Sequence, residues 1–140
     1  EGRGTMTTIS LSLNGETSFQ KLLGHNEEVM KKWSELGEVL ENTMSLSKDL
    51  KEHVRTALAH GNGCLYCKAK REPEKNIQDE KTIKALGFVS VFLRVGSAIP
   101  QGIFEVLKET FNEKEISELC AFVCFTTASQ YFGEMMDLRP

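Results

Sequence analysis

The chain has 140 residues, 40% of them hydrophobic and 26% charged, with a formal net charge of -3 and a pI of about 5.7. This is enough apolar material for the core of one domain of ordinary size. The mixed charge excludes the basic face of a nucleic-acid-binding protein. No apolar run reaches the roughly 18 residues of a membrane-spanning helix, so neither nucleic acid nor a membrane is expected as a partner.

The first residues resemble a processing remnant. Glu1-Gly2-Arg3 is typical of the end of a Factor Xa cleavage site, so residues 1–5 are assigned to an expression-tag remnant. Residues 6–140 are then expected to form a single domain that begins at Met6. No apolar stretch follows a basic start, so we expect a cytoplasmic protein without a secretory signal. In that reducing compartment four cysteines are more often free, metal-bound or catalytic than permanently bridged.

The elements predicted along the chain are helices, and the fold class is all-α. Thr17-Ser-Phe-Gln20 has the form of a capping box and follows a polar leader over 6–16. Apolar residues then recur at helical spacing. Further helices are expected over 27 to about 43, from a turn at 45–48 to about 60, from 64 to about 71 or 72, over 80–96, in a short helix after Pro100, and from a cap at 112 through Phe132.

The predicted helix over 80–96 is apolar around its circumference. Such a helix is normally buried on more than one side, which a chain of this length rarely achieves alone. We therefore expect a homo-oligomer. Trp33 and the aromatic residues of the last two helices are interpreted as core or interface residues, with no cofactor implied.

Cys64-Leu65-Tyr66-Cys67 stands at the start of a predicted helix, directly after Gly61-Asn62-Gly63. The unpaired N–H groups and the dipole at a helix start favour a thiolate. Lys68, Lys70 and Arg71 add positive charge within about one turn. Each effect lowers a thiol pKa below its usual value of about 8.5. The thiolate is the nucleophile in disulfide exchange and in attack on a peroxide, so the pair is a candidate redox site.

Other interpretations of these residues stay open. The pair can be an ordinary reduced pair or an incidental disulfide. A zinc site would need Cys120 and Cys124 as further ligands, but their apolar neighbours favour buried small hydrophobic residues. Glu52 lies on the preceding predicted helix, on its less apolar face. It either pairs with Arg55 in solvent or points into a cleft shared with the cysteine helix.

The stretch from Leu50 to Cys67 reads Leu-Lys-Glu-His-Val-Arg-Thr-Ala-Leu-Ala-His-Gly-Asn-Gly-Cys-Leu-Tyr-Cys. It resembles the core motif of the alkylhydroperoxidase D-like branch of the carboxymuconolactone decarboxylase superfamily. That motif is a Glu, eleven residues, Cys-x-x-Cys, three residues and a His. The order and length of the predicted helices are similar over nearly all of 14–138, but only the Glu and Cys positions are specific.

The resemblance implies orthogonally packed helices that assemble into a homo-trimer or homo-hexamer. It also implies an antioxidant oxidoreductase with a redox-active disulfide and without a cofactor, acting as a peroxidase. Cys67 would attack the hydroperoxide, Cys64 would resolve the product to a disulfide, and Glu52 would act in a proton relay. Electrons would come from a dithiol partner such as a lipoyl-bearing or thioredoxin-like protein.

The sequence departs from the family pattern at two positions. Arg71 stands where the family has its His, and Tyr66 stands between the cysteines where a His is common. Arginine stabilises a thiolate but accepts no proton near neutral pH. His60, four residues before Cys64, is a candidate substitute base. Arg71 is alternatively a surface charge paired with Glu74 or Glu72.

These departures affect peroxide reduction more than thiol–disulfide exchange. The leading hypothesis is therefore a thiol-dependent oxidoreductase that reduces a hydroperoxide or a disulfide. A lyase of the carboxymuconolactone decarboxylase type is an alternative, although that chemistry needs no dithiol. A degenerate, non-catalytic oligomeric member of the family is the other alternative, and the missing histidine favours it.

Overall fold

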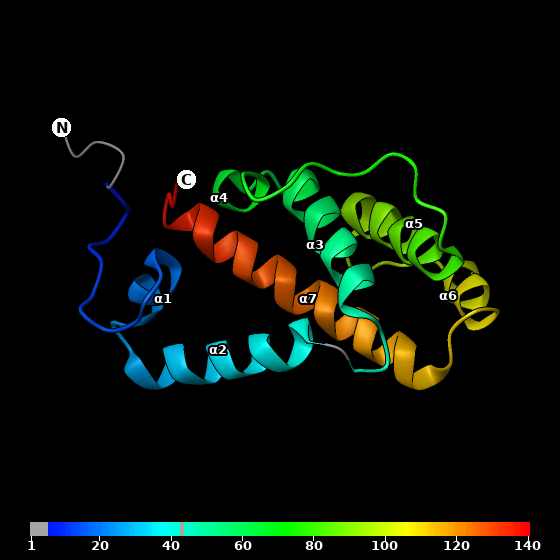
Figure 1. Ribbon diagram of the computed structural model, residues 1–140, viewed down its shortest axis with the longest axis horizontal. Helices are drawn as coiled ribbons and strands as arrows, with labels where there is room; N and C mark the ends of the chain where they lie inside the picture. Colours follow the sequence, from blue (N-terminus) through cyan, green and yellow to red (C-terminus); the bar gives the residue numbers. More distant parts are fainter. Residues whose placement is uncertain (1–5, 43) are drawn as a thin grey trace.

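A computed structural model describes residues 6–42 and 44–140, and within them it contains helices and no strand (Figure 1). The predicted all-α class is confirmed. The assigned tag remnant lies outside the described residues, as does residue 43. The helices are α1 (Ser18–Leu23), α2 (Glu27–Glu41), α3 (Lys48–Asn62), α4 (Leu65–Lys68), α5 (Glu80–Val95), α6 (Gln101–Lys108) and α7 (Glu113–Met135).

Side-chain caps fix two of the helix starts, as the sequence predicts. Thr17 Oγ1 accepts from the backbone N–H of Gln20 at 3.1 Å, and the Gln20 side chain completes a capping box at α1. At α7, Asn112 Oδ1 accepts from the N–H of Glu115 at 2.8 Å, and Glu115 Oε1 accepts from the N–H of Asn112 at 2.9 Å. Each cap satisfies N–H groups that have no partner within the helix.

Helix α7 runs diagonally through the molecule, between α2 on one side and α3 on the other (Figure 1). Helix α3 also packs on α5 and carries Val54, Leu58 and Ala59, which are completely buried. Burial of apolar side chains of this kind is the main stabilising contribution to the fold. The buried core consists of Leu40, Leu46, Leu50, Val54, Leu58, Ala85, Phe88, Val89, Leu107, Phe111, Leu119, Phe122 and Val123.

A buried ion pair, which no sequence pattern predicted, joins α3 to α7. Lys51 Nζ lies 2.7 Å from Glu118 Oε2, and both side chains are almost fully buried. Lys51 also donates to the carbonyl of Asn42 at 2.9 Å, while Glu118 accepts from the N–H groups of Ser45 and Leu46. Burial raises the pKa of Glu118, but these donors and the Lys51 charge together hold the pKa below its usual value.

The cysteine helix is shorter than predicted. Helix α4 ends at Lys68 instead of at position 71 or 72, and the chain is irregular from there to α5. The residues after Cys67 are mostly charged up to Pro73, so a longer helix would have no apolar face to bury. Before the pair, Gly63 ends α3 with a left-handed φ of 73°, a conformation that glycine adopts without strain.

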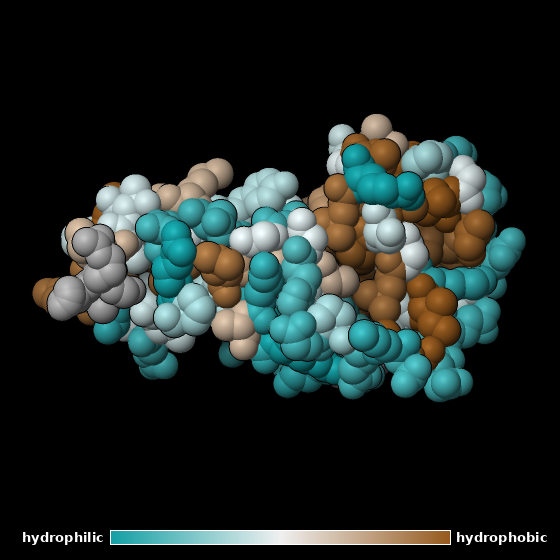
Figure 2. Space-filling model, turned by 90° about the horizontal axis from the view of Figure 1, so that it is seen from above, coloured by the Kyte–Doolittle hydropathy of each residue, from teal (hydrophilic) through white to brown (hydrophobic). Residues whose placement is uncertain are grey.

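The helix predicted to be apolar all round is only partly covered. Helix α5 buries Ala85, Phe88 and Val89, whereas Ile83 and Val95 are 49% and 41% exposed. Figure 2 shows apolar side chains gathered at the end of the molecule where α5 and α6 lie. We call this surface, with the exposed Ile83, Val95 and Val106, the α5–α6 patch. In the described residues, no helix is both long and apolar enough to cross a membrane.

Candidate active site

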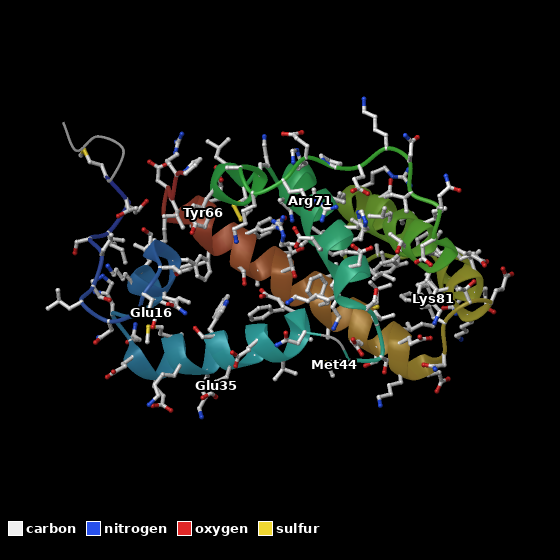
Figure 3. The ribbon with its side chains drawn as sticks, in the orientation of Figure 1. Glu16, Glu35, Met44, Tyr66, Arg71 and Lys81 are labelled. Atoms are coloured by element: carbon white, nitrogen blue, oxygen red, sulfur yellow. A yellow bond between two sulfur atoms is a disulfide. The ribbon has the colours of Figure 1, made fainter. Side chains whose placement is uncertain are left out.

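The two cysteines of the motif are paired but differ in accessibility. Their sulfur atoms lie at disulfide-bonding distance beside Tyr66, with the Cα atoms of Cys64 and Cys67 5.3 Å apart (Figure 3). Cys64 is 1% exposed, whereas Cys67 is half-buried and lines a cleft. A reagent in the cleft therefore meets Cys67 before Cys64.

The start of α4 supports the pair differently from the sequence prediction. Cys64 is the N-cap residue, and its Sγ accepts from the backbone N–H of Cys67 at 3.3 Å. Because α4 has only four residues, its aligned peptide dipoles add up to little. Positive side chains, rather than the helix dipole, are therefore the main source of local positive charge.

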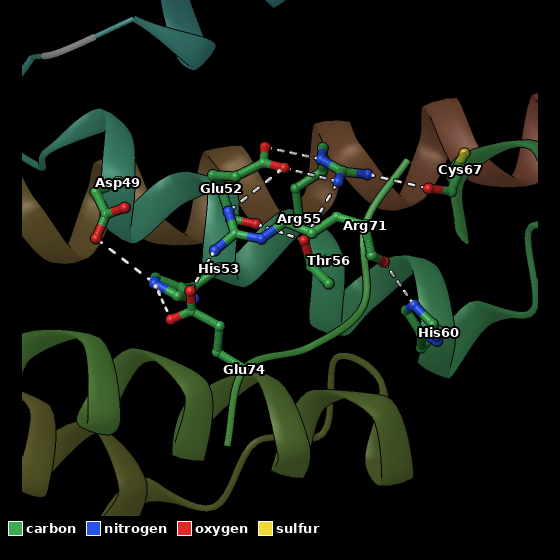
Figure 4. A network of polar contacts seen from close by, with 9 residues as sticks. All are labelled: Asp49, Glu52, His53, Arg55, Thr56, His60, Cys67, Arg71 and Glu74. Atoms are coloured by element: carbon green, nitrogen blue, oxygen red, sulfur yellow. Dashed lines mark hydrogen bonds and ion pairs between the residues drawn. The ribbon is translucent and has the colours of Figure 1, made fainter. Parts of the chain in front are cut away.

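Glu52 is held by two arginines (Figure 4). Arg55 donates to both of its carboxylate oxygens, at 2.9 and 2.8 Å, and Arg71 Nη1 lies 3.8 Å from Oε2. The Arg55 hydrogen bond is the largest cause that lowers the pKa of Glu52, against the effect of partial burial, and the charges of both arginines lower it further. Glu52 is therefore ionised near neutral pH and carries no proton to donate.

Arg55 is a site residue that the sequence analysis treated only as a surface partner of Glu52. Its Nη1 donates to the backbone carbonyl of Cys67 at 3.3 Å, and its Nη2 donates to Thr56 Oγ1 at 3.2 Å (Figure 4). The side chain is 15% exposed. Arg55 thus links the carboxylate of α3 to the cysteine turn. Its position one helical turn after Glu52 was the available signal.

The other predicted site residues divide between the site and structural contacts. Arg71 pairs with Glu74 at 3.2 Å, one of the two partners considered for it. The carbonyl of Arg71 lies 3.0 Å from His60 Nε2, which must carry a proton to donate there, so this nitrogen is not a free base. Tyr66 lines the cleft, and Lys70 Nζ lies 5.6 Å from the centroid of its ring.

The cleft at Cys67 has a volume of about 410 Å³ and lies among α1, α2, α3, α4 and α7. Trp33, predicted to be a core or interface residue, is half-buried and lines this cleft. Its Nε1 donates to Ser129 Oγ at 2.9 Å. A second hollow of about 560 Å³ is lined by Glu52 and shares Glu41, Arg55 and Lys70 with the first. The cleft residues come from five helices, so no local motif could have indicated them.

The remaining cysteines do not complete a metal site with the pair. The prediction that both are buried is wrong for Cys124, which is exposed, while Cys120 is half-buried. Burial, with a contribution from the neighbouring Cys124, raises the pKa of the Cys120 thiol. In the part of the chain that the structure describes, no group of three or more His, Cys, Asp or Glu side chains is placed to hold a metal ion.

No family model and no curated protein matches this chain. Function is therefore inferred from the residues of the site and their geometry.

Arg55→Met keeps most of the side-chain volume and removes the main donor to Glu52. The pKa of Glu52 is expected to rise toward its ordinary value, as measured by carboxyl-carbon NMR against pH. Because the folded pKa is lowered, Glu52 stabilises the wild type above its unfolded pKa, and this stabilisation is lost as pH falls through the folded value. Arg71→Met, which removes a more distant charge, should change the pKa less. An unchanged pKa in Arg55→Met would contradict the assignment.

Proposed function

We propose that this protein is a thiol-dependent oxidoreductase of the alkylhydroperoxidase D-like type, which reduces a disulfide or a hydroperoxide at the expense of a dithiol. The observation that supports this most is the asymmetry of the cysteine pair: Cys67 lines the cleft and Cys64 is buried directly behind it. This is the arrangement that an attacking and a resolving thiol require. Arg55, Arg71 and Lys70 supply positive charge that favours the Cys67 thiolate.

The reaction cycle moves two electrons. In the reduced protein, the Cys67 thiolate attacks one sulfur of a disulfide and expels the other sulfur as a thiolate. The Cys64 thiol loses its proton to solvent and attacks Cys67 Sγ, which expels the second thiolate and forms the Cys64–Cys67 disulfide. An external dithiol then reduces this disulfide and is itself oxidised to a disulfide.

The site favours disulfides over hydroperoxides as oxidants. Cleavage of a peroxide leaves an alkoxide or hydroxide, which needs a proton from a general acid. Glu52 is ionised and Arg71 does not release its proton. A thiolate leaves without such help when the pKa of its thiol is low.

We also propose a cytoplasmic homo-oligomer, a trimer or a hexamer of orthogonally packed helices. The α5–α6 patch supports association with another protein surface, because its exposed apolar side chains form a continuous surface of the kind that marks protein interfaces (Figure 2). A lipoyl-bearing or thioredoxin-like protein is the proposed reductant.

The proposal is tested by alkylation of the reduced protein with iodoacetamide over a pH series, in a background of Cys120→Ser and Cys124→Ser. Cys67 is expected to react with an apparent pKa below about 8.5. One equivalent of disulfide should then consume two thiols per chain, and mass spectrometry should recover a peptide linked through Cys64 and Cys67. Ordinary thiol reactivity without formation of this link would indicate a non-catalytic protein.

A further inference from the structure

The wall of the cleft around Cys67 is rich in aromatic side chains. Phe19, Trp33, Tyr66 and Phe125 are all half-buried and come from four different helices. The ring centroids of Trp33 and Phe125 are 5.6 Å apart. Flat apolar rings pack favourably on such surfaces. A volume of about 410 Å³ is also in the usual range for a site that binds a small organic molecule.

Charge is distributed unevenly around this cleft. Lys70 lines the same cleft as Cys67, and its charge contributes to the lowered pKa of Glu52, but no ion pair within 4.0 Å joins it to a carboxylate of the described residues. Glu38 and Glu41 belong to the opposite wall, on α2. The opposite signs on the two walls give no reason to expect a strongly charged ligand. The Lys70 ammonium group, which lies over the Tyr66 ring, instead supplies positive charge on the side of the cleft where a thiolate would depart.

The state of Glu52 narrows the choice of oxidant. The Glu52 carboxyl is ionised and held by Arg55, so it cannot protonate a leaving group. A substrate whose leaving group departs without a proton is therefore favoured. Aromatic thiols are more acidic than aliphatic ones, and a less basic thiolate leaves faster. The aromatic wall and the ionised carboxyl are independent observations, and both favour the same class of substrate.

We propose that the cleft is the binding site for a small aromatic disulfide, with one ring among Phe19, Trp33 and Phe125 and the adjacent sulfur facing Cys67. This inference rests on the proposed function and names its substrate class. Attack by the Cys67 thiolate breaks the substrate S–S bond and releases one aryl thiolate into the cleft that Lys70 also lines. Attack by Cys64 then releases the second aryl thiolate. The dithiol of the protein is oxidised by two electrons, and the substrate is reduced to two aryl thiolates.

The experiment mixes reduced protein with 4,4′-dithiodipyridine, an uncharged aromatic disulfide, or with bis(2-hydroxyethyl) disulfide, an aliphatic one, in single turnover. The rate should saturate with the aromatic probe and stay linear with the aliphatic probe. Ser34 lines the cleft without belonging to the cysteine site. Ser34→Phe should raise the half-saturating aromatic concentration about tenfold, which corresponds to about 1.4 kcal/mol. It should lower the aliphatic rate by a smaller factor, because that probe does not depend on contact with the aromatic wall.

Glu35→Phe is the matched control, because residue 35 is on the same helix with its side chain 65% exposed, and it should change neither rate. Equal effects of Ser34→Phe on both probes, or no saturation with the aromatic probe, would overturn the inference while leaving the proposed function intact. If neither probe forms the Cys64–Cys67 disulfide, the proposed function itself fails.

A binding measurement on the wild type makes the test independent of how well the variants fold. Trp33 is the single tryptophan of the chain, so intrinsic fluorescence reports on the cleft directly. Di(4-pyridyl) sulfide has the same rings but no S–S bond, so it binds without reacting. It should quench Trp33 fluorescence saturably and slow the reaction with 4,4′-dithiodipyridine in competition. Absence of both effects would contradict the aromatic site.

Discussion

Replacement of Cys67 by serine is expected to abolish reduction of a disulfide substrate, with a loss of about a thousandfold or more in rate. The serine hydroxyl remains protonated at neutral pH and cannot act as the thiolate does. Cys64→Ser should differ in kind, because it keeps the attacking sulfur in the cleft. It should complete the first attack and stop at a mixed disulfide between Cys67 and half of the substrate, which intact mass spectrometry detects as a stable adduct.

Cys124→Ser is the matched control for these variants, because it removes an exposed thiol that does not line the cleft. It should turn over at the wild-type rate. The opposite pattern, with an adduct in Cys67→Ser and none in Cys64→Ser, would reverse the two roles. Because Cys64 is buried, such a reversal would contradict the roles that we assign from accessibility.

Lys51→Met is expected to destabilise the protein by about 3 to 5 kcal/mol, because it leaves the Glu118 carboxylate buried without its partner. The methionine side chain fills most of the space of the lysine stem, so the loss reports on charge rather than on volume. Urea denaturation followed by circular dichroism measures it. The Lys51→Met, Glu118→Leu double variant should recover much of the loss, since no unpaired buried charge remains.

The same pair gives a pH dependence of a definite sign. The folded pKa of Glu118 is lowered, so the ion pair stabilises the wild type above the unfolded pKa, and this stabilisation is lost as pH falls through the folded value. In Lys51→Met the acid-induced loss from Glu118 should shrink or change sign. Lys48→Met, at an exposed position of the same helix, is the control and should change the free energy of unfolding little. A loss below about 1 kcal/mol in Lys51→Met would contradict the role of the pair.

The helices could be predicted closely from the sequence because their signals are local. Thr17 and Asn112 start helices through side chains only three residues away from the groups they cap. The predicted end of α4 lies three or four residues beyond the observed one, because basic residues suit a helix end as well as a helix interior. What stops α4 is the lack of an apolar face beyond Cys67, a property of packing rather than of local propensity.

The candidate site was predictable only where its residues are close in sequence. The apolar periodicity and the glycine-rich turn placed Glu52 on α3 and the cysteines at the start of α4, but Glu52 lines the neighbouring hollow and not the cleft at Cys67. The link through Arg55 to the carbonyl of Cys67 depends on how α3 lies against the cysteine turn. The aromatic cleft and the Lys51–Glu118 pair depend on tertiary contacts with α7. No pattern within a single helix encodes either of them.

The burial of Cys64 behind Cys67 has a kinetic consequence. If only one sulfur is open to the cleft, oxidant and reductant must react at the same atom and occupy the same space in turn. Under the proposed function, a ping-pong mechanism with parallel lines in a double-reciprocal plot is then expected. At high concentration, the oxidant should also bind to the disulfide form, which reacts with the reductant, and the reductant should also bind to the reduced form, which reacts with the oxidant. If the proposed function holds, the two co-substrates are therefore expected to inhibit each other competitively.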